Sequence, residues 1–268
     1  MKKVTIYLCA IAIMSSILMS NIPTTSAENI EEPEPFYCDE IIDTDRIQYP
    51  PHHHSPPGDE DTSEYMIGDV SVGIILLESD GTTDTSTENW TGVEMNNIFN
   101  KIQAACDWWE AIEPNAHLNF HLELHVGVPT SLEPITHNSR GPDEATWMNE
   151  AMTHLGYTTD QNNRNTGIQN YINNMRNVAG TDWGFVIFVV DSSNDDDHRF
   201  LDNWYAYARV GGPYIVMLNN NRDFPIDDND AVCAHEIGHI FYARDEYASS
   251  TTSTATTMSG YLNIEKFD

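Results

Sequence analysis

The chain has 268 residues, and 42 aspartate and glutamate residues against 12 lysine and arginine residues give it a formal net charge of −30 at pH 7. This length allows one sizeable hydrophobic core. The acidic balance excludes nucleic acid as an expected partner, because phosphate backbones are bound by clustered basic side chains. Of the four cysteines, Cys9 lies in an apolar N-terminal run, so the three that remain can form at most one disulfide bridge.

Residues 1–27 have the three-part layout of a secretory signal peptide. Two lysines precede an apolar run, and a stretch of small residues ends at Ala27. A retained membrane anchor is the alternative interpretation, although the apolar run is short for a bilayer span. We therefore expect a secreted protein, extracellular or at the cell surface, with no membrane span in the mature chain.

Residues 28–64 are acidic and rich in proline and histidine, a composition that cannot bury a core. The segment is predicted to be a linker or a pro-segment. Its three consecutive histidines, at 52–54, offer loose metal binding, but a flexible linker is the simpler explanation. The folded domain is expected over residues 65–268.

From Asp69 onward, the spacing of apolar residues predicts alternating strands and helices. The expected elements are a buried strand over 70–77, a helix over 91–111, a strand over 118–128, two helices within 143–178, a buried strand over 185–190, and an antiparallel pair over 205–210 and 214–218. Pro213 indicates that one strand of this pair lies near a sheet edge. The predicted fold class is α+β with an α/β-like N-terminal part, built on a mixed, twisted sheet with an antiparallel edge strand.

A further helix is predicted over 231–241, and acidic residues and an asparagine at 227–230 can cap its free amides. On a helix, His235 and His239 are displaced by only about 40° around the axis, and Glu236 lies within about 60° of His239. All three side chains can therefore face one cavity. Two imidazoles that bind zinc, with a carboxylate beside them, form the zinc site of a hydrolase.

The stretch from His235 to Asp245 resembles the extended zinc motif of the metzincin metallopeptidases, where the third ligand stands six residues beyond the second histidine. Asp245 occupies that position, as aspartate does in snapalysin-like and IgA-cleaving metallopeptidases. The resemblance implies a metzincin-like catalytic domain over 65–268, which binds zinc through His235, His239 and Asp245. It also implies that Glu236 is the catalytic base, and that the substrate is a protein or peptide.

Two positions depart from the metzincin pattern. Metzincins usually have glycine where Tyr242 stands, because the chain turns there through a left-handed conformation that a bulky residue disfavours. Either the helix ends differently here, or Tyr242 is strained. The methionine-bearing turn beneath the zinc has one candidate, Met258; otherwise the C-terminal subdomain is incomplete. Two more acids, Glu246 and Glu265, are alternative third ligands.

Other polar groups have both structural and functional interpretations. The acidic loops 195–197 and 227–228 offer the oxygen ligands that Ca²⁺ prefers, although a solvated acidic surface is the simpler explanation. His117, His121 and His125 alternate with apolar residues and should lie on one face of the second strand, either exposed or as an accessory metal site.

Two other functions stay open. One is a catalytically inactive zinc-binding surface or adhesion module of the same fold, against which the retained Glu236 argues. The other is an amide hydrolase acting on a cell-wall or small substrate. If the protein is a peptidase, the strand pair over 205–218 offers an edge along which an extended peptide can add as a further strand.

Overall fold

The computed structural model describes residues 58–59, 61–160, 163, 165–220 and 226–245, and the backbone of 257–259 and 262–264. The predicted signal peptide and most of the predicted linker lie outside the described residues, as do Glu246 and Glu265. No helix in the described ranges combines the length and the apolar character needed to cross a bilayer.

Every helix and strand expected from the sequence is present. In chain order they are β1 Asp69–Ser79, α2 Gly92–Ile112, β2 Asn119–Thr130, α3 Pro142–His154, α4 Asn165–Ala179, β3 Trp183–Val190, β4 Ala206–Ala208, β5 Tyr214–Leu218 and α5 Asn229–Ile240. The connections include the 3-10 turns η1 Pro114–Ala116, η2 Pro134–Thr136 and η3 Ile226–Asp228, and the backbone of a small hairpin, β6 Thr257–Ser259 and β7 Leu262–Ile264, follows α5.

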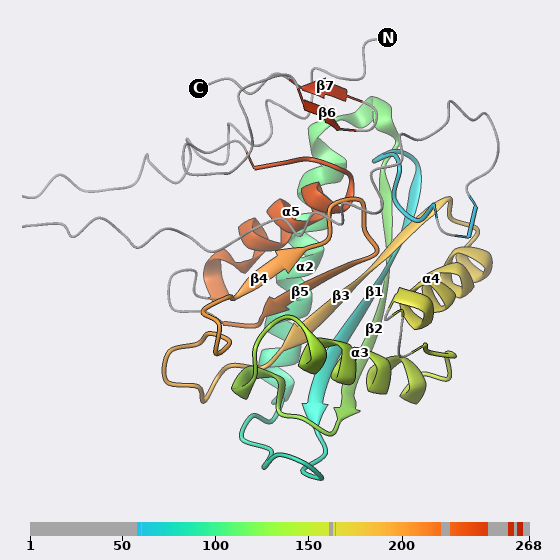
Figure 1. The fold of residues 1–268 in the computed structure, drawn as a ribbon. Helices are drawn as coiled ribbons and strands as arrows, with labels where there is room; N and C mark the ends of the chain where they lie inside the picture. The colour runs from blue at the N-terminus through green and yellow to red at the C-terminus, as the bar shows by residue number, and fades with distance from the viewer. Residues whose placement is uncertain are drawn as a thin grey trace, which may run out of the picture.

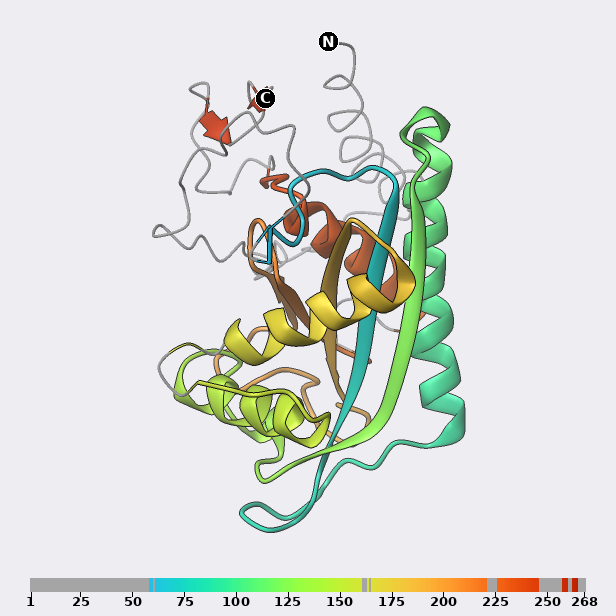
Figure 2. The ribbon, with the colours of Figure 1, turned by 90° about the vertical axis from the view of Figure 1, so that its right-hand side faces the viewer.

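The strands β1 to β5 form one mixed sheet in the order β2-β1-β3-β5-β4. The strands β2, β1, β3 and β5 run parallel, and β4 pairs antiparallel with β5 at one edge. Helices α3 and α4 cover one face of the sheet, and α2 and α5 cover the other (Figures 1 and 2). The predicted mixed sheet with its antiparallel edge pair is confirmed. Because helices cover both faces, the architecture is α/β rather than α+β.

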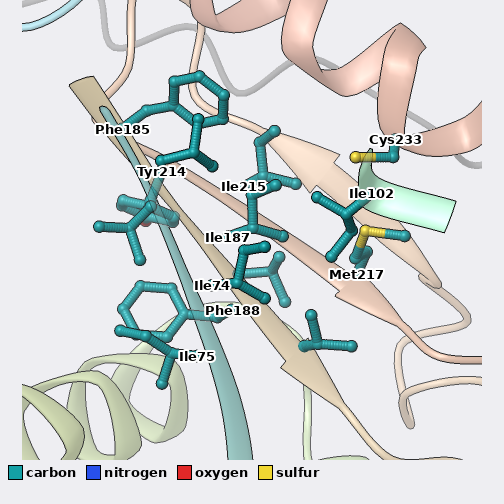
Figure 3. Packing of buried hydrophobic residues seen from close by; sticks show 14 of the residues in the cluster. Ile74, Ile75, Ile102, Phe185, Ile187, Phe188, Tyr214, Ile215, Met217 and Cys233 are labelled. Carbon is teal, nitrogen blue, oxygen red and sulfur yellow. The ribbon is translucent and has the colours of Figure 1, made fainter. Parts of the chain in front are cut away.

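The core fills both faces of the sheet. Figure 3 shows Ile187 of β3 on the side where Ile102 of α2 and Cys233 of α5 lie. On the opposite face, the Phe188 ring meets Trp147 of α3 edge-on, with ring centroids 5.6 Å apart. All five side chains are fully buried. A strand covered on both faces has no polar face, which explains why β3 is apolar without alternation.

Helix α5 is fixed to this core along its length. The Trp109 indole of α2 donates a hydrogen bond to the Ala234 carbonyl at 2.9 Å, and the Phe241 ring packs edge-on against Phe185 of β3. At the start of the helix, the buried Asn229 amide donates to two carbonyls at the end of β5. The N-cap residue, Asp228, makes no side-chain capping hydrogen bond. The expected capping by acidic side chains is therefore wrong at that position, and Asn229 anchors the helix instead.

Candidate metal centre

Three side chains converge just beyond the end of α5. The Nε2 atoms of His235 and His239 lie 3.0 Å apart, and Asp245 Oδ1 lies 3.1 Å from the first and 3.5 Å from the second. Two ligands of a tetrahedral zinc ion, each about 2.0 Å from the metal, are separated by about 3.3 Å. The three predicted ligands therefore have the separations of zinc ligands. Among the described residues this is the only group of three metal-binding side chains drawn together in this way.

The triad is buried on one side and open on the other. The His239 and Asp245 side chains are 2 % and 3 % exposed, whereas the His235 side chain is 24 % exposed. Burial, helped by the positive charge of His235, lowers the pKa of His239 to about 4. His239 is thus neutral near pH 7, and the neutral imidazole is the form that binds a metal. The open side lies at His235.

A backbone carbonyl orients the His239 ring. His239 Nδ1 lies 2.8 Å from the Ala243 carbonyl oxygen. Because a carbonyl oxygen can only accept, Nδ1 carries the proton and the lone pair is on Nε2, which faces Asp245 and His235. Metal-bound histidines are typically held in this way by a partner on the second nitrogen. The ring is already oriented for a metal in this position.

The chain turns toward Asp245 through a Schellman motif in which tyrosine takes the usual place of glycine. The Tyr242 amide donates to the His239 carbonyl and the Ala243 amide to the Gly238 carbonyl, both at 3.0 Å. Tyr242 has a φ of +69°, in the left-handed region. Of the two alternatives, the structure shows the second: the helix ends as in proteins with glycine at this position, and Tyr242 takes the left-handed conformation. Such a conformation costs a bulky residue about 1–2 kcal/mol.

The Tyr242 ring lies over the turn between β4 and β5. A Cβ atom added to Gly211 would come within 2.6 Å of two Tyr242 ring atoms. The Gly211 amide donates to the His239 carbonyl at 3.0 Å, and the Gly211 carbonyl accepts from Ser63 Oγ at 3.0 Å. This glycine, with a φ of +79°, thus joins the end of α5 to the segment that precedes β1.

Glu236 lies on α5 between the two histidines and is fully buried. It is not part of the converging triad. Glu236 therefore lies on the same helix as the two histidines, and its predicted role as catalytic base stays a prediction.

The other histidines predicted as an accessory site do not gather. His121 pairs with Asp69 at 2.7 Å, and His125 pairs with Glu123 at 2.8 Å. His117 ends the turn η1 before β2 begins, so the expectation that it shares the strand face is wrong. His121 and His125 therefore belong to separate pairs, and the three histidines do not converge among the described residues.

The two acidic loops named as calcium candidates have other roles. Asp195 Oδ1 accepts the backbone amides of Asp197 and His198, which closes its own turn. The backbone carbonyl of Asp227 accepts from Lys101 of α2, and Asp228 is exposed. Neither loop draws three ligand atoms together among the described residues.

The expected substrate edge is covered. Strand β4 does lie at the sheet edge, but Ala206, Tyr207 and Ala208 are each 0 % exposed. An extended peptide therefore cannot add to β4 in this conformation. Met258, the candidate for the methionine turn, lies in β6 opposite Asn263 of β7, and the described residues do not include its side chain.

Sequence reasoning found the three converging side chains but missed the groups that orient them. The Ala243 carbonyl has no sequence signal, because every residue carries a carbonyl. Gly211 has one, since consecutive glycines before a proline indicate a turn with unusual backbone angles. The comparisons with models of known families, with curated proteins and with solved structures found no match for this chain. The arrangement itself therefore carries the functional argument.

Proposed function

We propose that this protein is a zinc-dependent endopeptidase, exported from the cell, with His235, His239 and Asp245 as zinc ligands. A single observation carries the proposal. His235, His239 and Asp245 converge on one point, and one of the three side chains is partly exposed to solvent. Structural zinc sites are usually closed by four protein ligands, whereas catalytic sites use three and leave a position open. The separations of 3.0 to 3.5 Å fit this ion, and His235 is the partly exposed member of the triad, so in this proposal the substrate approaches from its side.

Glu236 is the general base in this proposal. A bound zinc ion supplies Lewis acidity, lowering the pKa of water to about 7 and polarising a carbonyl. Glu236 accepts the proton from the attacking water and returns it to the departing amine. His239 keeps its Nε2 lone pair toward the metal because Nδ1 is bound to the Ala243 carbonyl. Asp245 adds one negative charge, which makes the water slightly less acidic than three neutral imidazoles would.

The experiment compares the full chain with its Glu236→Gln variant on an unfolded protein substrate, with bound zinc measured in both. We expect one zinc ion per chain in each and a fall in the hydrolysis rate of about 10²–10⁴-fold in the variant, typical of the loss of a general base. Glu123→Gln, the same chemical change at an exposed glutamate on β2, is the matched control and should leave the rate unchanged.

Two outcomes contradict the proposal. Equal hydrolysis by the parent and the Glu236→Gln variant would remove Glu236 from the mechanism. Zinc binding without hydrolysis in either protein would favour the inactive binding module, in which the metal stabilises the end of α5 and the carboxylate has no role.

A further inference from the structure

The segment that leads into β1, residues 61–68, lies at the end of the sheet where the triad converges, and we call it the entry segment. The Thr62 carbonyl accepts the Gly184 amide of β3 at 2.8 Å. Thr62 and Ser63, which stand near the end of the predicted linker, are only 2 % and 1 % exposed. The entry segment is therefore packed into the folded structure.

Ser63 binds the turn between β4 and β5. Its Oγ atom donates a hydrogen bond to the Gly211 carbonyl at 3.0 Å, although the two residues stand 148 positions apart in the chain. The next residue, Gly212, lies against the same side chain, because a Cβ atom added to it would come within 2.6 Å of Ser63 Oγ and 3.3 Å of Thr62 Oγ1. This approach leaves no room for a side chain at Gly212, so the entry segment and the turn are in direct contact.

The same turn supports the end of α5. The Gly211 amide donates to the His239 carbonyl at 3.0 Å, and the Tyr242 ring lies over Gly211. Beyond Tyr242 come Ala243, whose carbonyl lies 2.8 Å from His239 Nδ1, and the proposed ligand Asp245. Gly211 is thus held on one side by the entry segment and contacts the metal-binding end of α5 on the other.

The entry segment is anchored on both sides of Ser63. Before it, Arg176 of α4 donates from Nη1 to the Gly58 carbonyl at 3.1 Å. After it, the Tyr65 ring packs against Trp183 at the start of β3, with ring centroids 5.6 Å apart. A side chain positions a site well when its own place is fixed by packing and hydrogen bonds. The Ser63 hydroxyl is such a fixed donor for the turn.

We propose that Ser63 is a positioning residue of the zinc site. By holding the Gly211 carbonyl, it keeps the β4–β5 turn against Tyr242, and the left-handed turn at Tyr242 then places Ala243 and Asp245 correctly for the metal. The inference rests on the zinc ligands of the proposed function, but it does not depend on hydrolysis. It makes the entry segment a part of the metal centre.

The expected size of the effect follows from the distance of Ser63 from the metal. Loss of a group that orients a metal ligand weakens metal binding by about 10–100-fold, and Ser63 acts through the backbone of the turn, so we expect about tenfold. Coupling between two parts of a protein is reciprocal. If the entry segment strengthens zinc binding about tenfold, bound zinc must hold the entry segment in place by the same factor.

The first experiment titrates the zinc-free full chain and its Ser63→Ala variant with zinc. The variant should bind zinc about tenfold more weakly than the parent. Ser139→Ala is the matched control, since Ser139 is 0 % exposed and donates a hydrogen bond of the same length, 3.0 Å, to Asp202 in the loop after β3. This control loses a buried serine hydroxyl at the other end of the sheet and should bind zinc as the parent does.

A spectrum separates positioning from a general loss of stability. The visible absorption of Co²⁺ bound in place of zinc depends on the geometry of its ligands. Ser63→Ala saturated with Co²⁺ should show a changed spectrum, because Asp245 is held less well, whereas the spectrum of Ser139→Ala should match that of the parent.

Hydrogen exchange of the parent tests the reciprocal effect without any variant. Zinc should slow exchange of the amides in residues 62–66 about tenfold, and it should leave exchange in residues 137–141 unchanged. This measurement decides the question even if Ser63→Ala does not fold.

Three results would overturn the inference: zinc bound by Ser63→Ala as tightly as by the parent, equal weakening in Ser63→Ala and Ser139→Ala, or exchange at 62–66 that zinc does not change. A parent that binds no zinc would overturn both this inference and the proposed function. A parent that binds zinc about tenfold more tightly than Ser63→Ala but hydrolyses no protein would support the role of Ser63 and contradict the endopeptidase.

Discussion

The two ends of the central sheet hold charged groups in opposite ways. At the end where the β4–β5 turn lies, two imidazoles and one carboxylate converge to 3.0–3.5 Å, and two of the three come from one turn of α5. At the carboxyl ends of β1 and β3, the carboxylates of Glu78 and Asp191 accept hydrogen bonds from backbone amides, and no three metal-binding side chains of the described residues converge there. Helix α5, about 18 Å long at 1.5 Å per residue, runs from one end to the other, since Asn229 binds the end of β5 and His239 lies at the triad.

The contrast teaches what brings metal-binding side chains together. The triad is compact because helical periodicity and one Schellman turn set it locally. The carboxylates at the other end belong to segments far apart in sequence, and each is held by a backbone amide.

The largest effect that would test this contrast is loss of a proposed zinc ligand. His239→Ala should lower zinc affinity more than about 100-fold, because loss of an outer-shell contact alone costs about 10–100-fold. Hydrolysis should fall with it. Bound zinc and the hydrolysis rate are the measurements.

The control for this change is His154→Ala, an exposed histidine at the end of α3. It should retain zinc and hydrolysis. If His239→Ala bound zinc as tightly as the parent does, His239 would not be a ligand, and the comparison would fail.

An intermediate effect on stability and zinc affinity is expected where the β4–β5 turn contacts the end of α5. Gly211→Ala would place a methyl group within 2.6 Å of the Tyr242 ring. Overpacking of this kind costs about 1–3 kcal/mol of unfolding free energy, and displacement of Tyr242 should also weaken zinc binding. Urea unfolding and a zinc titration measure the two effects.

Gly81→Ala separates the clash from the backbone cost. Gly81 has a φ of +74°, close to the +79° of Gly211, but nothing lies within 4 Å of its added Cβ. Gly81→Ala should lower the free energy of unfolding by about 1–2 kcal/mol, the cost of a left-handed alanine. The zinc affinity should stay that of the parent. Equal losses in both variants would show that the Tyr242 contact is unimportant.

The smallest effect concerns a histidine whose pKa is shifted in the opposite direction to that of His239. His137 binds Asp84 at 2.7 Å and Asp143 at 3.2 Å, and although burial lowers its pKa, these hydrogen bonds raise it above 6.5 overall. Protonated His137 therefore stabilises the fold fully below pH 6.5, and this contribution is lost as the pH rises through the raised pKa.

Urea unfolding from pH 5.5 to 8 checks this sign. The parent should exceed His137→Gln by at most about 1 kcal/mol below pH 6.5, because the side chain is partly solvated, and the difference should shrink toward pH 8. His154→Gln is the matched control. A difference between parent and variant that stays constant with pH would show that the charge of His137 has no role.

Most of the elements were predictable because their signals are local. Alternation and helical spacing placed every strand and helix, and the spacing from His235 to Asp245 identified the triad. The errors arose where distant contacts decided the outcome. The start of α5 is held by the Asn229 side chain, which binds the end of β5, and not by an acidic cap at Asp228. Strand β4 lies at the sheet edge, but its residues are buried.

The sequence by itself determined the order of the strands and helices and the relation of the two histidines on α5, because a helix fixes the relation of residues four positions apart without help from the rest of the chain. Only the tertiary structure decided that Tyr242 takes a left-handed turn over Gly211, and that Glu78 and Asp191 lie at the same end of the sheet. These two acids stand 113 positions apart in the chain and have no periodic relation, and the parallel pairing of β1 with β3 brings them to the same edge of the sheet.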